Sequence, residues 1–173
     1  MDVVICAWAE VRAWFWEWDF AHIISIGEPG DPLPEPLDVD DPRVLRLEFH
    51  DTLPFDDFDD GPDWEHAEAL VCFGQRILST GGATLVHCAA GISRSSASAL
   101  TLLAMSYGPG REEDAVAALG ALPGGHRARP NTALIRLVDD ILERDGALLL
   151  ALDEGYYDCL LYTSDAADEV VGG

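Results

Sequence analysis

The segment from His87 to Ser95 places a cysteine and an arginine at a spacing that suits phosphate chemistry. It reads HCAAGISRS, so five residues separate Cys88 from Arg94. The apolar run before it, Thr84–Val86, is typical of a buried strand, and the residues after it are typical of a helix. A loop that leads into a helix N-terminus offers unpaired backbone N–H groups to an anion, and the helix dipole favours negative charge there.

The loop after Cys88 is predicted to hold a phosphate group. Gly91 allows the backbone to bend so that several N–H groups point inward. The planar guanidinium of Arg94 can hold two phosphate oxygens at once, which places the phosphate over the Cys88 sulfur. The predicted phosphate-binding residues are Ala89, Ala90, Gly91, Ile92, Ser93 and Arg94.

Cys88 is the predicted nucleophile. Its positive surroundings favour the thiolate, which would attack phosphorus and form a cysteinyl-phosphate intermediate. His87 is expected to hydrogen-bond the loop backbone and help to keep Cys88 ionised, and Ser95 to offer its hydroxyl to the departing sulfur. The plainer interpretation, a core cysteine near a surface arginine, leaves the adjoining histidine, glycine and serines unexplained.

The same nine residues resemble the HCxxGxxRS signature of the cysteine-dependent protein tyrosine phosphatases. Its fixed positions are matched by His87, Cys88, Gly91, Arg94 and Ser95. A short chain with the signature in mid-sequence is similar to the compact, dual-specificity-like branch of the family, especially its bacterial members. Residues 129–142 (RPNTALIRLVDDIL) also resemble the closing helix of those proteins. The resemblance covers residues 3–150 and implies hydrolysis without a metal or other cofactor.

The resemblance implies a general acid on a loop that precedes the signature, because the leaving oxygen of the substrate needs a proton. Asp51 directly follows a predicted strand, and the segment His50-Asp51-Thr52 lies where compact members carry their acid. Asp51 is therefore the first choice. Asp56 and Asp57 remain alternatives, since the loop is rich in aspartate.

The predicted substrate is a phosphorylated protein or peptide. The variable loop positions are neutral, whereas phosphoinositide-directed relatives tend to carry basic residues there, so phosphotyrosine is favoured and phosphoserine and phosphothreonine stay open. Two other classes of function remain as alternatives. One is a catalytically silent phosphate-binding module, and the other is a thiol enzyme of the arsenate-reductase or sulfurtransferase kind.

The remaining sequence predicts an α/β fold with a central, mostly parallel sheet of four to five strands flanked by helices. The predicted strands are Val3–Cys6, His22–Gly27, Arg43–Phe49 and Ala83–Val86. The predicted helices are Ala7–Trp18, Trp64–Ser79, Ser95–Tyr107, Arg111–Leu122 and Asn131–Arg144. Asp63 and Asn131 are suitable N-caps for two of them.

Two sets of apolar residues are predicted to lie in the core. A helical stripe near the N-terminus has the 3- and 4-residue spacing of a buried face. It consists of Trp8, Val11, Trp14, Phe15 and Trp18. Cys72, between Val71 and Phe73, is expected to be a buried helix cysteine rather than a redox partner of Cys88.

The charge balance limits the classes of partner. The chain of 173 residues has 32 acidic and 10 basic residues, giving a net charge of −22. All the basic residues are arginines. Such a chain repels nucleic acid and anionic membranes at long range, so neither is an expected partner. No signal-like segment is seen at the start, so we expect a cytoplasmic protein. The cysteines and histidines are scattered, so we expect no metal site. We also expect a monomer.

Residues 1–157 are predicted to form a single phosphatase domain. The rest, residues 158–173, is expected to be a non-native tail, because the segment CLLYTSDAADE resembles a translated sequencing adapter. Removing this tail would change the net charge only from −22 to −18, so the conclusions drawn from charge do not depend on it.

Overall fold

The computed structural model describes residues 1–52 and 60–155. The alternative acids Asp56 and Asp57, and the tail at 158–173, lie outside the described residues. Within them the chain forms one sheet of strands β1 (Val3–Ala7), β2 (Phe20–Gly27), β3 (Val44–Glu48) and β4 (Ala83–Cys88). The order is β1-β4-β2-β3 and every pairing is parallel, which confirms the predicted fold class.

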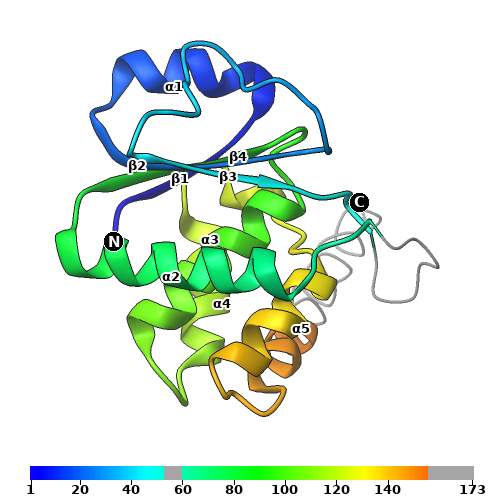
Figure 1. Cartoon of the computed structure of the whole chain (residues 1–173). Coiled ribbons are helices and arrows are strands. Elements are labelled where there is room, and N and C mark those ends of the chain that lie inside the picture. The colour runs from blue at the N-terminus through cyan, green and yellow to red at the C-terminus, as the bar shows by residue number, and fades with distance from the viewer. Residues whose placement is uncertain (53–59, 156–173) are drawn as a thin grey trace, which may run out of the picture.

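The helices cover both faces of the sheet (Figure 1). On one face lies α1 (Val11–Glu17), which follows a short 3-10 turn at Trp8–Glu10. The other face carries α2 (Trp64–Thr80), α3 (Arg94–Tyr107), α4 (Glu112–Ala121) and α5 (Thr132–Ile141). A second 3-10 turn spans Gly125–Arg127, and residues 147–155 are again helical.

Alternation along the strands divides the core into two parts. Val3 and Ile5 pack into the large cluster with α2 to α5, whereas Val4 and Cys6 pack into the small cluster with Val11 of α1. The hydrophobic runs are therefore continuous in sequence because both faces of the parallel sheet are buried. Because all four strands are parallel, their carboxyl ends lie at one edge of the sheet. The predicted site residues follow the strands at this edge.

The helix caps confirm part of the sequence analysis. Asp63 accepts a hydrogen bond from the backbone N–H of His66, and Gly81 ends α2 with a positive φ of 69°. Asn131 caps α5 through the backbone N–H of Leu134. This last helix ends at Ile141, earlier than predicted, and the helical segment at 147–155 was not predicted.

Three predicted core residues lie at the surface instead. Trp8 and Trp18 expose 45% and 42% of their surface, so the aromatic stripe is only partly a core face. The reason is that α1 is a helix of only seven residues preceded by a 3-10 turn, which breaks the expected period. Cys72 is also exposed, so the prediction that it is buried is wrong.

Within the described residues, none of the helices is long and apolar enough to cross a bilayer.

Candidate active site

The loop of residues 89–93 joins the end of β4 to the start of α3. Gly91 has a φ of 69°, and a Cβ atom there would lie 2.6 Å from the backbone carbon of Cys6. Only glycine meets both demands, because other residues disfavour this φ and real Cβ atoms do not approach backbone so closely. The close contact with β1 thus fixes the curve of the loop.

The carbonyl groups of this loop are bound by groups outside it. Ala89 O accepts a hydrogen bond from Trp8 N at 3.2 Å, and Ile92 O accepts one from Arg129 N at 2.9 Å. Ser93 O accepts one from Asn131 N at 3.2 Å. A loop that is held in this way and leads into a helix N-terminus can offer backbone N–H groups to an anion.

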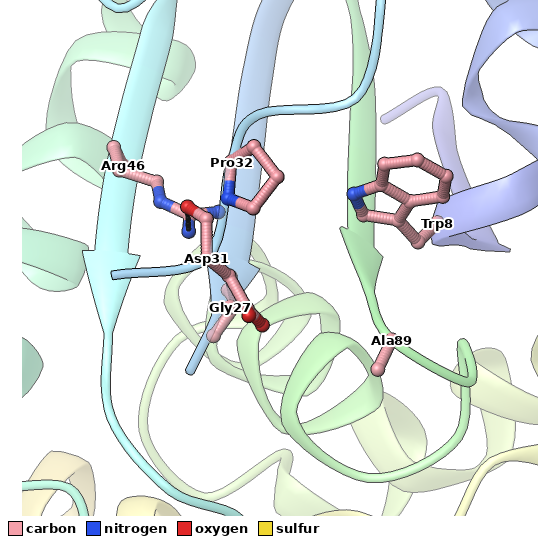
Figure 2. A pocket seen from close by; sticks show the side chains of 7 residues that line it. Trp8, Gly27, Asp31, Pro32, Arg46 and Ala89 are labelled. Atoms are coloured by element: carbon pink, nitrogen blue, oxygen red, sulfur yellow. Dashed lines mark hydrogen bonds between the residues drawn. The ribbon is translucent and has the colours of Figure 1, made fainter. Parts of the chain in front are cut away.

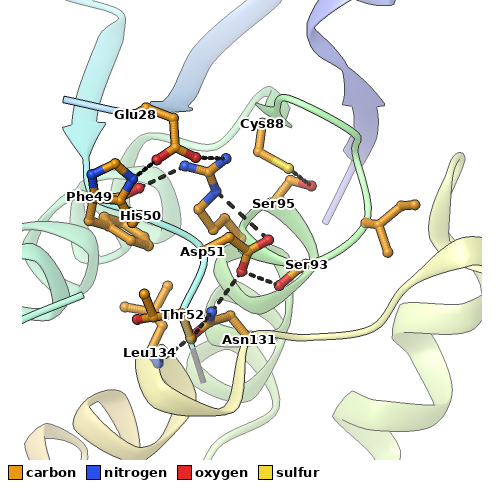
Figure 3. Close-up of polar contacts among 12 residues, drawn as sticks. Glu28, Phe49, His50, Asp51, Thr52, Cys88, Ser93, Ser95, Asn131 and Leu134 are labelled. Atoms are coloured by element: carbon orange, nitrogen blue, oxygen red, sulfur yellow. Dashed lines mark hydrogen bonds and ion pairs between the residues drawn. The ribbon is translucent and has the colours of Figure 1, made fainter. Parts of the chain in front are cut away.

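Cys88 and Ser95 meet at the base of this loop. The Cys88 Sγ and Ser95 Oγ atoms lie 3.2 Å apart, and both side chains are buried (Figure 3). The pair forms because Cys88 ends β4 and Ser95 is the second residue of α3. A hydroxyl at this distance can donate a hydrogen bond to a thiolate.

The guanidinium of Arg94 is buried and held from two sides. Its Nη1 donates to Phe49 O at 2.7 Å, and its Nη2 forms an ion pair with Glu28 Oε1 at 2.9 Å. The Nε atom has no hydrogen-bond partner among the described residues and lies 4.0 Å from Asp51 Oδ2. This buried donor without a hydrogen bond could be satisfied by an oxygen of a bound anion.

Asp51 lies beside the loop and is held by two donors. Its Oδ1 accepts hydrogen bonds from Ser93 Oγ at 2.6 Å and from Asn131 Nδ2 at 2.8 Å (Figure 3). Asn131 Nδ2 also donates to Thr52 O at 2.8 Å, so a single side chain positions two neighbouring residues of the acid-bearing segment. The Asp51 side chain remains about one-third exposed and open to solvent.

His87 lies on the opposite face of β4 from Cys88, because successive side chains of a strand alternate. Burial, together with the charge of Arg46, lowers the pKa of His87 to about 4, although the nearby Cys88 backbone acts in the other direction. The ring is therefore neutral at pH 7. Neither ring nitrogen has a hydrogen bond of good geometry among the described residues, and the support of Cys88 by His87 stays a prediction.

Cys6 is the other buried cysteine near the site. It pairs with His87 across β1 and β4. Burial raises the pKa of its thiol to about 12, and the negative charges of Glu10 and Cys88 act in the same direction. Cys6 is therefore a protonated thiol at neutral pH and a poor nucleophile.

Cys88, Arg94, Ser95 and Asp51 thus lie close together. Sequence analysis missed Glu28, which forms an ion pair with Arg94 and also contacts the His50 ring. It directly follows β2 just as the segment with Asp51 follows β3, and carboxyl ends of neighbouring parallel strands share an edge. That pattern is the signal that could have indicated Glu28.

Comparison with known proteins rests on structure. No protein-family model matches the sequence. A search of curated proteins finds no match either. Several crystal structures are similar in fold. The human tyrosine phosphatase-like serine/threonine/tyrosine-interacting protein is 21% identical, with a TM-score of 0.58 over 86% of this chain and 93% of that one.

Two further structures are similar to a comparable degree. DUSP15 is 26% identical, with a TM-score of 0.57 over 88% of this chain and 90% of its own. PTPMT1, in complex with PI(5)P, is 15% identical, with a TM-score of 0.56 over 84% and 93%. The chain therefore has the fold of the dual-specificity and tyrosine phosphatase-like proteins. The similarity extends over most of the chain.

Proposed function

We propose that this protein is a cysteine-dependent phosphatase that hydrolyses phosphotyrosine in proteins or peptides. The observation that carries the proposal is the buried Nε of Arg94, which lacks a hydrogen-bond partner among the described residues, beside the Cys88–Ser95 pair at the start of α3. This arrangement offers a nucleophile, a hydrogen-bond donor for it and an anion-binding N-terminus in one place. The phosphatase-like fold also supports the proposal of a phosphatase.

In the first step, the Cys88 thiolate attacks phosphorus while the loop N–H groups and Arg94 hold the phosphate oxygens. The S–P bond forms as the bond between phosphorus and the tyrosine oxygen breaks. Asp51 donates its proton to that oxygen, so tyrosine leaves as the neutral phenol. Ser93 and Asn131 hold the carboxyl group of Asp51 in place for this transfer.

In the second step, water attacks the phosphorus of the cysteinyl-phosphate. Asp51, now a carboxylate, takes a proton from the water, and the S–P bond breaks to release inorganic phosphate. The electron pair returns to Cys88 Sγ, where the Ser95 hydroxyl stabilises the thiolate through the contact of 3.2 Å. His87 takes no direct part, since its side chain faces away from the loop.

The contact between Glu28 and Arg94 favours one alternative function. At 2.9 Å, Glu28 already engages the guanidinium that would bind phosphate, and a carboxylate there competes with an anionic ligand. A protein that binds phosphoresidues without hydrolysing them would keep the loop but turn over slowly. We place hydrolysis first, because the acid Asp51 is present and held in position.

Hydrolysis of p-nitrophenyl phosphate and of a phosphotyrosine peptide, in EDTA, tests the proposal. The full chain should hydrolyse both substrates, and Cys88→Ser should hydrolyse neither while still binding an oxyanion such as vanadate or tungstate. Turnover that persists in Cys88→Ser would reject the cysteine mechanism. A folded parent protein that binds phosphotyrosine peptide without releasing phosphate would favour the binding module.

A further inference from the structure

A hollow of about 290 Å3 opens at the carboxyl edge of the sheet, next to the phosphate loop. Its base is formed where Gly27 ends β2 and Ala89 follows β4, two positions with little or no side chain. The Trp8 indole stands on one side and the Arg46 guanidinium on the other (Figure 2). Ala89 belongs to both the hollow and the phosphate loop, so the hollow adjoins that loop.

Two charged side chains line this hollow, Arg46 and Asp31. The charge of Arg46 is paired with Glu48 Oε1 at 3.2 Å, and its guanidinium also donates to Ser25 Oγ at 3.0 Å and to the backbone Asp31 O at 2.8 Å. Asp31 is therefore the charge left for a ligand to pair with. The Asp31 carboxylate points into the hollow (Figure 2). It accepts a hydrogen bond from Glu28 N at 3.0 Å and forms no ion pair with a described residue.

Trp8 supplies the second feature of the hollow. The ring is 45% exposed although it adjoins a buried site, and its backbone N–H is fixed by Ala89 O. A half-exposed indole opposite a carboxylate is suited to a cationic side chain, because the ring face attracts a cation and the carboxylate pairs with it.

We propose that this hollow is a substrate subsite for a lysine or arginine side chain located a few residues from the phosphorylated residue. The inference rests on the proposed phosphatase function and narrows its substrate class to peptides with a basic neighbour. The hydrocarbon stem of the side chain packs between Trp8 and Pro32, and its cationic group reaches Asp31. The net charge of −22 attracts a basic peptide at long range as well.

The test uses three phosphotyrosine peptides that are identical except for their flanking residues, which are lysine and arginine in one, leucine in the second and glutamate in the third. The kcat/KM of the full chain should be about 5- to 30-fold higher for the basic peptide than for the leucine peptide, from a cation–π contact and one exposed ion pair together. The preference should shrink as salt is added.

Two variants locate the preference. Trp8→Ala and Asp31→Asn should each reduce the ratio of kcat/KM for the basic peptide to kcat/KM for the leucine peptide several-fold. Asp31→Asn keeps an acceptor for Glu28 N, so the local backbone contact is retained. Trp16→Ala is the matched control, because Trp16 is 71% exposed on α1 and does not line the hollow. It should retain the ratio of the parent protein.

The outcomes separate this inference from the proposed function. A parent protein that hydrolyses p-nitrophenyl phosphate but shows no basic preference, or prefers the glutamate peptide, overturns the subsite alone. So does a basic preference that survives both Trp8→Ala and Asp31→Asn. If nothing is hydrolysed, the proposed function fails, and the same peptides are compared by fluorescence anisotropy. Tighter binding of the basic peptide, lost in both variants, then supports the subsite, and equal binding of all three overturns it.

Discussion

Asn131 links α5 to the segment that carries Asp51, so replacing it tests how the site is held together. Its side chain is buried and makes three hydrogen bonds. Oδ1 accepts from Leu134 N at 2.9 Å, and Nδ2 donates to Thr52 O and to Asp51 Oδ1, each at 2.8 Å. Asn131→Ala removes all three at once.

The expected loss of stability follows from these contacts. Removing an N-cap costs about 1 kcal/mol. Leaving the buried Thr52 carbonyl without its donor costs about 1 kcal/mol more, and the partly exposed bond to Asp51 adds about 0.5 kcal/mol. Asn131→Ala should therefore lower the free energy of unfolding by about 2–3 kcal/mol, measured by urea unfolding followed by tryptophan fluorescence.

A second substitution separates the cap from the contact with Asp51. Asn131→Asp keeps an acceptor for Leu134 N but places a second carboxylate beside Asp51 and removes the donor to Thr52 O. It should lose turnover of a phosphotyrosine peptide at least as severely as Asn131→Ala, while recovering about 1 kcal/mol of stability through the cap. Ser93→Ala is the milder control, since it removes only one donor to Asp51. An Asn131→Asp variant that matches the parent protein in turnover would refute this reasoning.

Four other substitutions test individual contacts. Arg94→Lys should lower kcat/KM at least 100-fold, since an ammonium cannot span two oxygens. Oxyanion binding should weaken too, and binding close to that of the parent protein would argue against the role of Arg94 in holding phosphate. Gly91→Ala forces a Cβ to 2.6 Å from the Cys6 backbone and should abolish turnover, with loss of oxyanion binding as the direct measurement. Asp51→Asn should slow hydrolysis of phosphotyrosine peptide by about 10²–10⁴-fold. It should slow hydrolysis of p-nitrophenyl phosphate less, because p-nitrophenolate leaves without a proton. Equal losses for the two substrates would count against Asp51 as the general acid. Because the pKa of His87 is lowered from 6.5 to about 4, the unfolded state binds the extra proton and stability falls as the pH drops through that window. Urea unfolding at pH 7 and 4.5 should show the parent losing about 2–3 kcal/mol more than His87→Gln, and identical losses would contradict the buried neutral ring.

The sequence could indicate the strand, loop and helix around Cys88 because these elements are contiguous. Their hydrophobic runs, Gly91 and the start of α3 are local features, and local features are what periodicity and turn chemistry report. The caps at Asp63 and Asn131 were predictable for the same reason. The choice of Asp51 rested on its position directly after a predicted strand together with the family resemblance.

Contacts between distant segments could not be derived in this way. Glu28 reaches Arg94 because the sheet order places β2 beside β4, and nothing in the sequence fixes that order before the fold is known. The second role of Asn131, as a donor to Asp51, depends on how α5 packs against the loop after β3. The orientation of His87 could have been predicted, since alternation along β4 already separates it from Cys88.

The central claim is that a phosphoryl group passes through Cys88. The most direct test mixes the full chain with excess phosphotyrosine peptide, quenches with acid within milliseconds and maps modified peptides by mass spectrometry. We predict a phosphoryl group on the peptide that contains Cys88, formed at least as fast as steady-state turnover and absent from Cys88→Ser. Phosphate release with no such adduct at any time, or turnover that continues in Cys88→Ser, would contradict the mechanism.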